Sequence, residues 1–143
     1  MRGFEIAKGY DGVNLPKRST KGSAGYDFEL LEALTLKPGE IKLGITGVKA
    51  YMNEDEVLKL YPRSSLPKKF GVTIPNNVGI IDSDYYGNED NDGAIFIQLY
   101  NFTSNTVTIA KGTRVAQGIF NKYLLSRDDQ ATTVRNGGFG STG

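Results

Sequence analysis

Apolar residues recur at every second position along much of this chain, and this period constrains the fold more than any other feature. The clearest stretches are 41–45, 95–99 and 107–109, in which isoleucine, leucine or valine occupies alternate positions. Successive side chains of a strand point to opposite faces, so this pattern predicts half-buried β-strands. Turn-forming residues separate the stretches at short spacing, as in KPGE at 37–40 and NFTSN at 101–105. Many short strands joined by tight turns predict an all-β sandwich or barrel with very little helix.

Two stretches leave helix and strand open. Residues 28–36 contain helix formers, but Leu34 and Leu36 also fit a strand that enters the turn at 37–40. Residues 53–60 begin like a helix N-terminus and could form one or two turns. We favour a strand for the second half of that stretch.

The length of 143 residues suits one domain with a real core. We find no repeat or linker, and expect a single β domain over residues 1–134 followed by a flexible C-terminal arm over 135–143. Four of the nine arm residues are glycine, which is typical of a mobile terminus. The arm also carries Arg135 and Phe139, a charge and a stacking surface. Composition alone leaves its task open.

Cysteine and histidine are both absent from the sequence. Disulfides, thiolate nucleophiles and cysteine-bound zinc are therefore excluded, together with the commonest general base. An enzyme built from this chain would use a carboxylate as its base at neutral pH. Any metal would be a hard ion bound through oxygen.

The charges of the chain nearly cancel, with 17 Lys and Arg against 16 Asp and Glu. This balance creates no overall field that would attract nucleic acid or an anionic membrane, so we expect neither direct nucleic-acid binding nor membrane association. No apolar run approaches the length of a signal-peptide core or a membrane span. The expected location is the cytoplasm, and any anion binding must come from local clusters.

Asp82 and Asp84 follow two apolar residues in the stretch GIIDSDYYG at 79–87. Positions i and i+2 of a strand share a face, so both carboxylates could point into one site. Close like charges raise one carboxylate pKa, which helps to make a base. An ordinary strand that ends in an Asp- and Gly-rich hairpin explains the pattern equally well.

A second polar cluster lies in YPRSSLPKKFG at 61–71, where Arg63 precedes Ser64 and Ser65 and two lysines follow. A guanidinium beside hydroxyl groups suits an oxyanion such as phosphate. If either serine caps a short helix, backbone N–H groups would add donors. The alternative is a plain helix cap followed by a solvated basic turn.

The acidic loop NEDNDG at 88–93 resembles the start of an EF-hand calcium loop, but Leu99 stands where a bidentate glutamate is needed. We therefore expect a solvated loop tip. In the stretch 114–120, Arg114 and Gln117 interrupt an apolar strand, and we expect Val115, Gln117 and Ile119 to share a face. Buried polar residues must be paired, so the two polar residues indicate a site, an interface or a structural ion pair.

Five stretches in this order resemble the five motifs of the trimeric deoxyuridine triphosphatase (dUTPase) family: AGYDFE (24–29), PRSSL (62–66), NNVGIIDSDYYG (76–87), RVAQGIF (114–120) and RNGGFGSTG (135–143). The resemblance implies a jelly-roll β subunit and a homotrimer with three active sites, each built from more than one subunit. It also implies hydrolysis of dUTP to dUMP and pyrophosphate with Mg²⁺ on the triphosphate. That reaction limits uracil in DNA and supplies dUMP for dTMP synthesis.

The resemblance assigns roles to matched residues. Asp82 corresponds to the residue that orients and deprotonates the attacking water, and Asp27 to the carboxylate that holds a metal-bound water. Tyr85 corresponds to the tyrosine packed under the deoxyribose, where it would crowd out a ribose 2′-hydroxyl. Asn76 falls where the family's hairpin reads the uracil edge, partly through backbone groups.

The implied phosphate contacts come from two places in the chain. Residues before the arm would bind the α- and β-phosphates or lie on the phosphate side, namely Arg63, Ser64, Ser65 and Gln117. In the arm, Phe139 would stack over uracil, and three residues would close on the γ-phosphate: Arg135, Ser141 and Thr142. Arg114 is not assigned to the site, because a structural role accounts for it equally well.

Two features depart from the family pattern. Only Asn136 separates Arg135 from the glycine pair, whereas two residues are common, and the loop 88–93 is longer than usual. The longer loop keeps open a regulatory protein of phage type that binds a protein partner through this loop. A dCTP deaminase, which shares the β fold and an arginine–serine–serine stretch, is a further alternative.

Overall fold

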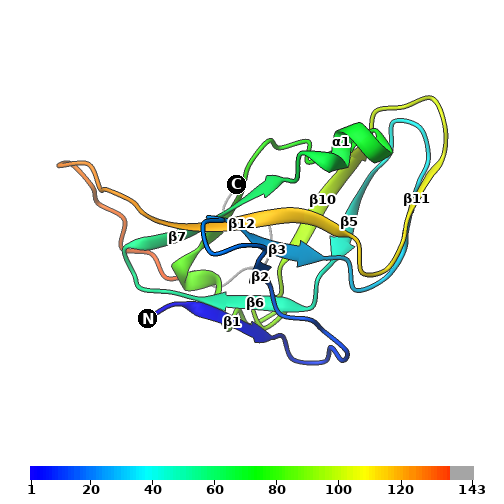
Figure 1. Cartoon of the computed structure of the whole chain (residues 1–143). Helices are drawn as coiled ribbons and strands as arrows, with labels where there is room; N and C mark the ends of the chain where they lie inside the picture. The colour runs from blue at the N-terminus through cyan, green and yellow to red at the C-terminus, as the bar shows by residue number, and fades with distance from the viewer. Residues whose placement is uncertain (136–143) are drawn as a thin grey trace.

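The computed structural model describes residues 1–135, and strands make up most of its regular structure (Figure 1). The strands in chain order are β1 (Gly3–Ile6), β2 (Lys17–Arg18), β3 (Tyr26–Glu29), β4 (Leu34–Leu36), β5 (Ile41–Ile45), β6 (Val48–Tyr51), β7 (Glu56–Pro62), β8 (Val72–Thr73), β9 (Gly79–Asp82), β10 (Phe96–Asn101), β11 (Val107–Ile109) and β12 (Arg114–Lys122). Helix is confined, within the described residues, to α1 (Ser65–Phe70) and the 3₁₀ turn η1 (Ser83–Tyr85). The all-β class expected from the sequence is confirmed.

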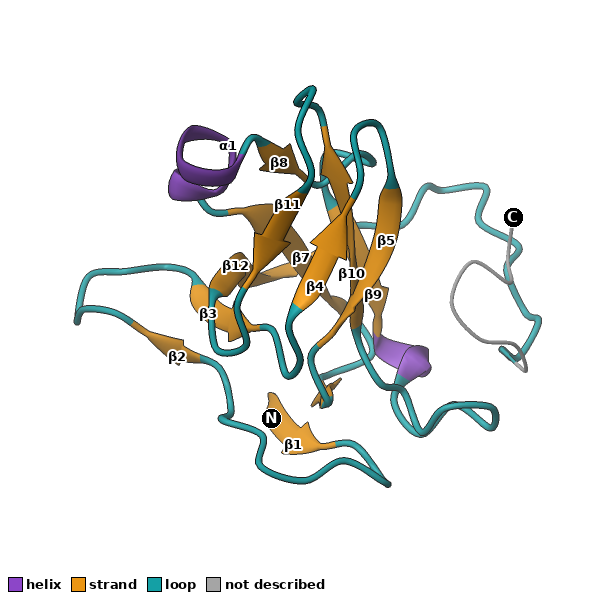
Figure 2. Ribbon diagram, turned by 90° about the vertical axis from the view of Figure 1, so that its right-hand side faces the viewer, coloured by secondary structure: helices purple, strands orange, loops and turns teal. Residues whose placement is uncertain are grey.

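The largest sheet has the order β2-β3-β12-β7-β9, and a second sheet has the order β5-β10-β8. Two antiparallel pairs, β1-β6 and β11-β4, complete the strands (Figure 2). Strand β12 is the centre of the largest sheet, because it pairs with β3 on one side and with β7 on the other. Figure 2 also shows that the two short helices lie at opposite ends of the strand layers.

The alternating sequence pattern produces the core. On β10 the side chains of Ile97, Leu99 and Asn101 are buried while their neighbours are partly exposed. Gly118 in the middle of β12 allows close packing, because a Cβ atom there would lie 2.8 Å from the Phe28 ring and 3.0 Å from Leu58. Burial of such apolar side chains is the main favourable term for folding.

Both ambiguous stretches form strands. Residues 28–36 contain the end of β3 and all of β4, and β7 begins at Glu56, so the preference for a strand there is confirmed. The expectation that Val115 and Gln117 share a face is wrong, because the pairing of β12 with β3 shifts register between Arg114 and Ala116. That β-bulge leaves Val115 fully buried and Gln117 partly exposed.

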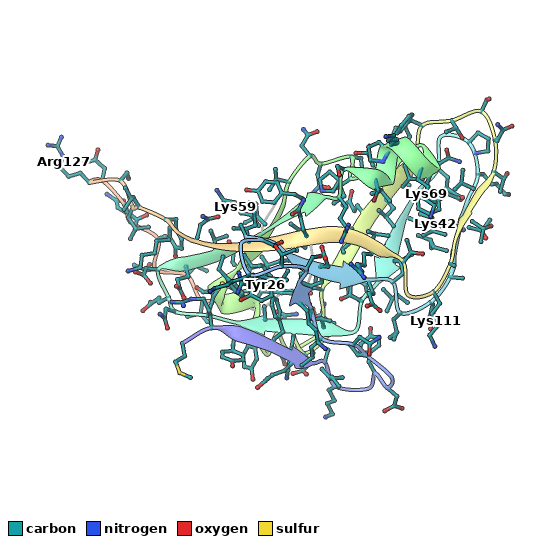
Figure 3. All side chains as sticks on the ribbon, in the orientation of Figure 1. Tyr26, Lys42, Lys59, Lys69, Lys111 and Arg127 are labelled. Atoms are coloured by element: carbon teal, nitrogen blue, oxygen red, sulfur yellow. The ribbon has the colours of Figure 1, made fainter. Side chains whose placement is uncertain are left out.

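The segment after β12 extends away from the sheets, and Arg127 lies at its tip (Figure 3). Its apolar residues are exposed, with Leu124 at 95% and Leu125 at 68% of their full accessibility. Within residues 1–135, no helix is long and apolar enough to cross a membrane.

Candidate active site

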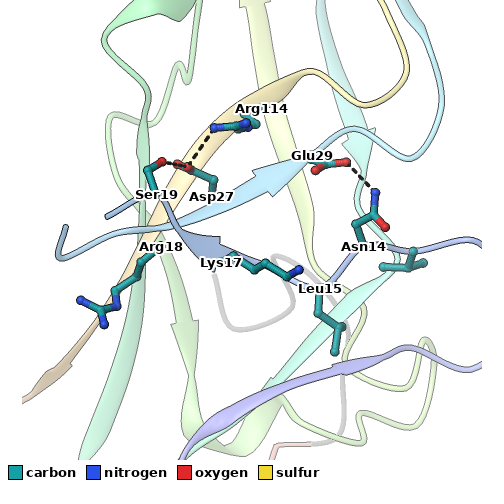
Figure 4. A pocket seen from close by; sticks show the side chains of 9 residues that line it. Asn14, Leu15, Lys17, Arg18, Ser19, Asp27, Glu29 and Arg114 are labelled. Atoms are coloured by element: carbon teal, nitrogen blue, oxygen red, sulfur yellow. Dashed lines mark hydrogen bonds and ion pairs between the residues drawn. The ribbon is translucent and has the colours of Figure 1, made fainter. Parts of the chain in front are cut away.

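The first polar cluster surrounds Asp27 on β3. Its carboxylate lies 2.6 Å from Nη1 of Arg63 and 3.7 Å from Nη1 of Arg114. The hydroxyl of Ser19 donates a hydrogen bond of 2.8 Å to the same carboxylate (Figure 4). Two guanidinium groups around one carboxylate leave an excess of positive charge at this place.

The Arg63–Asp27 contact is an ion pair without the alignment of a hydrogen bond. Nη1 of Arg63 is buried and makes no hydrogen bond to any group in the described part of the chain. The Asp27 oxygen 2.6 Å away is nevertheless the charged partner of this nitrogen. The neighbouring cavity of about 580 Å³ is lined by Lys17, Arg18 and Arg114 against Asp27 and Glu29.

Gln117 lies beside this cluster, and the two serines follow Arg63 in the chain. Gln117 pairs across the sheet with Asp27 on one side and Tyr61 on the other. Gly25 leaves room for it, because a Cβ atom at that position would lie 2.5 Å from Oε1 of Gln117. Ser64 stands at the N-cap of α1 but makes no side-chain cap bond, and both Ser64 and Ser65 are exposed. The prediction that a serine side chain caps α1 is therefore not met by Ser64 at the N-cap.

The second polar cluster lies where β9 ends and η1 begins. Arg135 donates from Nη2 to Asp82 at 2.6 Å and from Nε to Asp84 at 2.8 Å. The Arg135 side chain is only 12% exposed, whereas the two carboxylates are about half exposed. The hydrogen bond to Asp84 is the largest cause that raises the pKa of Arg135. A cavity of about 530 Å³ adjoins all three residues.

The two carboxylates converge as expected, but for a different reason. Asp82 is the last residue of β9, and Asp84 belongs to the 3₁₀ turn η1, so strand alternation does not bring them together. The turn places both within reach of one guanidinium. Arg135, which the family resemblance assigns to the γ-phosphate, is bonded here to Asp82 and Asp84.

Tyr85 is buried beside this cluster, with 4% of its surface exposed. Its hydroxyl donates to the backbone carbonyl of Ala94 at 2.6 Å and accepts from Nδ2 of Asn91 at 2.8 Å. Burial is the main cause that raises the pKa of this phenol. The hydroxyl end of the Tyr85 ring is thus held by hydrogen bonds to Asn91 and Ala94.

The interpretation of 88–93 as a solvated loop tip is wrong for most of the loop. Asn88 is buried at 6% exposure, and Asp92 accepts hydrogen bonds from Nζ of Lys49 at 2.8 Å and from the backbone N–H of Lys8 at 2.9 Å. Asp92 also adopts a left-handed backbone conformation with φ of 58°. Only the tip at Glu89 and Asp90 is exposed. No local sequence pattern indicates the contacts of Asp92, because Lys8 and Lys49 are distant in the chain.

Asn76 lies in the turn between β8 and β9, which belong to different sheets, so the hairpin that the family resemblance implies is a connection between sheets here. The next residue, Asn77, has φ of 67° and donates its N–H to Ile74 at 3.0 Å. The carbonyl of Asn76 accepts from the N–H of Val78 at 2.8 Å, and both asparagine side chains are exposed. A tight turn of this kind presents backbone groups at its tip.

The two clusters are well separated within one chain. Asp27 on β3 is level with Gln117 on β12 and with Tyr61 on β7. Asp82 on β9 is level with Val57, which lies four residues from Tyr61 along β7. In the order of the sheet, β9 is three strands away from β3. With strands about 4.8 Å apart and a rise of about 3.3 Å per residue, their Cα atoms are roughly 20 Å apart. The chain alone does not bring Asp27 and Asp82 into one site. Three expected site residues, Phe139, Ser141 and Thr142, lie outside the described residues.

The fold and these clusters define an all-β protein with a cleft rich in cationic side chains and, at a distance from it, a pair of carboxylates. A family model described as dUTPase matches residues 11–143. The chain is 53% identical over 147 residues to deoxyuridine 5'-triphosphate nucleotidohydrolase of Lactococcus lactis subsp. lactis (strain IL1403), covering 100% of this chain and 98% of that protein. This chain belongs to the dUTPase family.

Solved structures agree with the assignment. The crystal structure of dUTPase from Streptococcus mutans has a TM-score of 0.81 and 46% identity, over 87% of this chain and 98% of that one. Staphylococcus bacteriophage 80alpha dUTPase has a TM-score of 0.74 and 22% identity, over 94% and 98%. The phage enzyme therefore shares the fold with this chain.

Proposed function

We propose that this protein hydrolyses dUTP to dUMP and pyrophosphate by attack of water on the α-phosphorus. The observation that carries the proposal is the similarity over the whole chain to a named deoxyuridine triphosphate nucleotidohydrolase at 53% identity. The cationic cluster at Asp27, Arg63 and Arg114 adds support, since a triphosphate is a polyanion.

Asp82 is the proposed base that orients and deprotonates the water. Its carboxylate is half exposed and adjoins a cavity, so a water molecule has access to it. In the resting arrangement Arg135 donates to Oδ2 of this carboxylate, so Arg135 must change partners to reach the γ-phosphate. Tyr85 lies under the deoxyribose, and the turn at Asn76 reads the uracil edge.

The proposed phosphate contacts are Arg63, Ser64, Ser65 and Gln117. The Arg63 guanidinium, which pairs with Asp27 in the cationic cluster, supports this assignment. From the arm, Phe139 stacks over the base while Arg135, Ser141 and Thr142 close on the γ-phosphate. An arm that closes on substrate excludes water from the reacting atoms.

The active assembly is a homotrimer in this proposal. Asp27 and Asp82 are roughly 20 Å apart in one chain by strand spacing, so a site that uses both needs a second copy. The exposed Leu124 and Leu125 are apolar surface that a neighbouring subunit would cover. Solution mass by light scattering tests this part, with a monomer as the contradicting result.

Mg²⁺ is the proposed metal, carried into the site by the triphosphate. Within residues 1–135 no group of three or more acidic side chains could hold an ion, and Asp27 already pairs with Arg63. This donor set fits an ion that keeps its own waters, one of which Asp27 holds. Bound there, the ion would neutralise phosphate charge. A structural Mg(II) ion is described for the phage phi11 dUTPase of S. aureus.

Pyrophosphate release from dUTP, dCTP, UTP and dTTP with Mg²⁺ tests the function. We expect release from dUTP alone at low enzyme concentration, and equal turnover of UTP or dCTP contradicts the proposal. Asp82→Asn removes the base, so turnover should fall at least 100-fold while dUTP still binds. Ammonia release from dCTP would indicate the deaminase alternative, for which the matched family model offers no support.

A regulatory role through the loop 88–93 would be an added function. The exposed Glu89 and Asp90 support such a role, because the Lys49–Asp92 contact anchors the loop that presents their charges to solvent. Pull-down from host lysate with the intact loop and with a shortened loop tests it, and equal recovery of partners clears the loop. The cytoplasmic location stays a prediction.

A further inference from the structure

The loop 88–93 is built around the hydroxyl of Tyr85. Nδ2 of Asn91 donates to this hydroxyl at 2.8 Å, and the hydroxyl donates in turn to the carbonyl of Ala94 at 2.6 Å. The other end of the same amide, Oδ1 of Asn91, accepts from the N–H of Gly93 at 3.0 Å and from Nδ2 of Asn88 at 3.2 Å. One asparagine side chain therefore joins the turn of the loop to the tip of the tyrosine.

The loop that holds Asn91 is itself fixed at several points. The N–H of Asn88 donates to the carbonyl of Tyr85 at 3.1 Å, and the N–H of Asp92 donates to the carbonyl of Asn88 at 2.7 Å. The Lys49–Asp92 ion pair ties the loop to β6, and the hydrogen bond holds the pKa of Asp92 below its ordinary value. Asn91 consequently stands on a rigid support, so its amide can fix the position of another group.

We propose that Asn91 is a positioning residue that, through the Tyr85 hydroxyl, sets the wall of the sugar pocket and so sharpens the preference for deoxyribose over ribose. This inference rests on the proposed function, in which the Tyr85 ring packs under the deoxyribose. The Tyr85 ring is buried and its hydroxyl is hydrogen-bonded, so the ring cannot shift to make room for a 2′-hydroxyl. Without the amide, the hydroxyl keeps the carbonyl of Ala94 but loses its second restraint.

The most informative variant is Asn91→Ser. A serine hydroxyl can still accept from the N–H two residues on, as asparagine does with Gly93, so the turn survives. The shorter side chain cannot donate to Tyr85. We expect the ratio of kcat/KM for dUTP to that for UTP to fall about fivefold, the factor that one hydrogen bond of typical net worth contributes. Asn91→Ala should give at least the same loss.

Tyr85→Phe supplies the test of the route. If Asn91 acts through the hydroxyl, Asn91→Ser should change the dUTP/UTP ratio less than twofold in the Tyr85→Phe background, because the two sites are then coupled. Asn101→Ala is the matched control, since Asn101 is also a buried amide that braces a loop, through the carbonyls of Leu36 and Asn105. It should lower stability and leave the ratio unchanged.

A readout without nucleotide separates this inference from the proposed function. In protein labelled with ¹³C at the tyrosine ring, the Tyr85 resonance, assigned by its loss in Tyr85→Phe, should shift in Asn91→Ser and not in Asn101→Ala. Two results overturn the role of Asn91 alone. One is an unchanged dUTP/UTP ratio of kcat/KM in an Asn91→Ser protein that is as stable as the wild type. The other is a fall of this ratio on Asn91→Ser in the Tyr85→Phe background that is as large as in the wild type. A wild-type protein that turns over UTP as fast as dUTP overturns the proposed function, and the sugar-selecting role with it.

Discussion

Asp84 holds Arg135 away from its proposed place at the γ-phosphate, and Asp84→Asn should release it. Arg135 makes one hydrogen bond to Asp84 at 2.8 Å and one to the proposed base Asp82 at 2.6 Å. A triphosphate that recruits Arg135 must first break both contacts. The asparagine removes the charge of the first contact while keeping nearly the same shape, so dUTP should bind more tightly.

The magnitude follows from the exposure of the partners. Asp84 and Asp82 are 57% and 51% exposed, so solvent screens both ion pairs, although the Arg135 side chain is only 12% exposed. Exposed pairs contribute about 0.2–1 kcal/mol, and the largely buried guanidinium places this one at the upper end, about 1 kcal/mol. Loss of the charged contact therefore corresponds to a tightening of about fivefold at most.

Calorimetric titration with a non-hydrolysable α,β-imido analogue of dUTP measures the binding step without chemistry, which KM alone does not. Asp55→Asn is the matched control, because Asp55 lines the same cavity and contacts Lys122 rather than Arg135. It removes the same charge next to the incoming triphosphate. We expect Asp84→Asn to tighten binding by more than Asp55→Asn, and the difference should shrink at high salt. Equal affinities in the two variants would refute the restraint by Asp84.

Two further predictions concern the fold. Gly118→Ala should lower the free energy of unfolding by about 1–3 kcal/mol, because its Cβ would lie 2.8 Å from the buried Phe28 ring; an unchanged denaturant midpoint contradicts this. Glu56 pairs with Arg2, whose hydrogen bond lowers the pKa of Glu56 below its ordinary 4.5. Its stabilising contribution is thus present above pH 4.5 and lost as pH falls through the folded-state pKa, and Glu56→Gln should flatten acid unfolding in that window.

The strands were predictable where their signal is local. The alternation at 41–45 and 107–109 correctly predicted the strands β5 and β11. The burial that it predicted holds on β11, where Ile109 is buried, but is wrong on β5, where Ile41 and Leu43 are exposed in the single chain. The bulge at Val115 was not predictable from the sequence, since it arises from the register between β12 and β3, which are far apart in the chain. Non-local pairing leaves no local pattern.

The site residues divide in the same way. The local sequence predicted the polar clusters at Arg63 and Asp82, whereas Asp27 was predicted only through the resemblance to the family motif AGYDFE. Ser19 was missed, since only the pairing of β2 with β3 brings its hydroxyl to Asp27. Asn91 was also missed: its polar neighbours suggested a solvated loop, and the contact that decides its role is made with a buried phenol.

The register of β12 joins the stability of the fold to the geometry of the site. Gly118 faces the core beneath Phe28 and Leu58, while the preceding Gln117 faces the Asp27 cluster next to Gly25. A slip of one residue would turn Gln117 into the core, where its amide would lack partners, and would carry Gly118 to the cleft. Core packing and the geometry of the Asp27 cluster therefore depend on the same pairing, and a variant that loosens one should loosen the other.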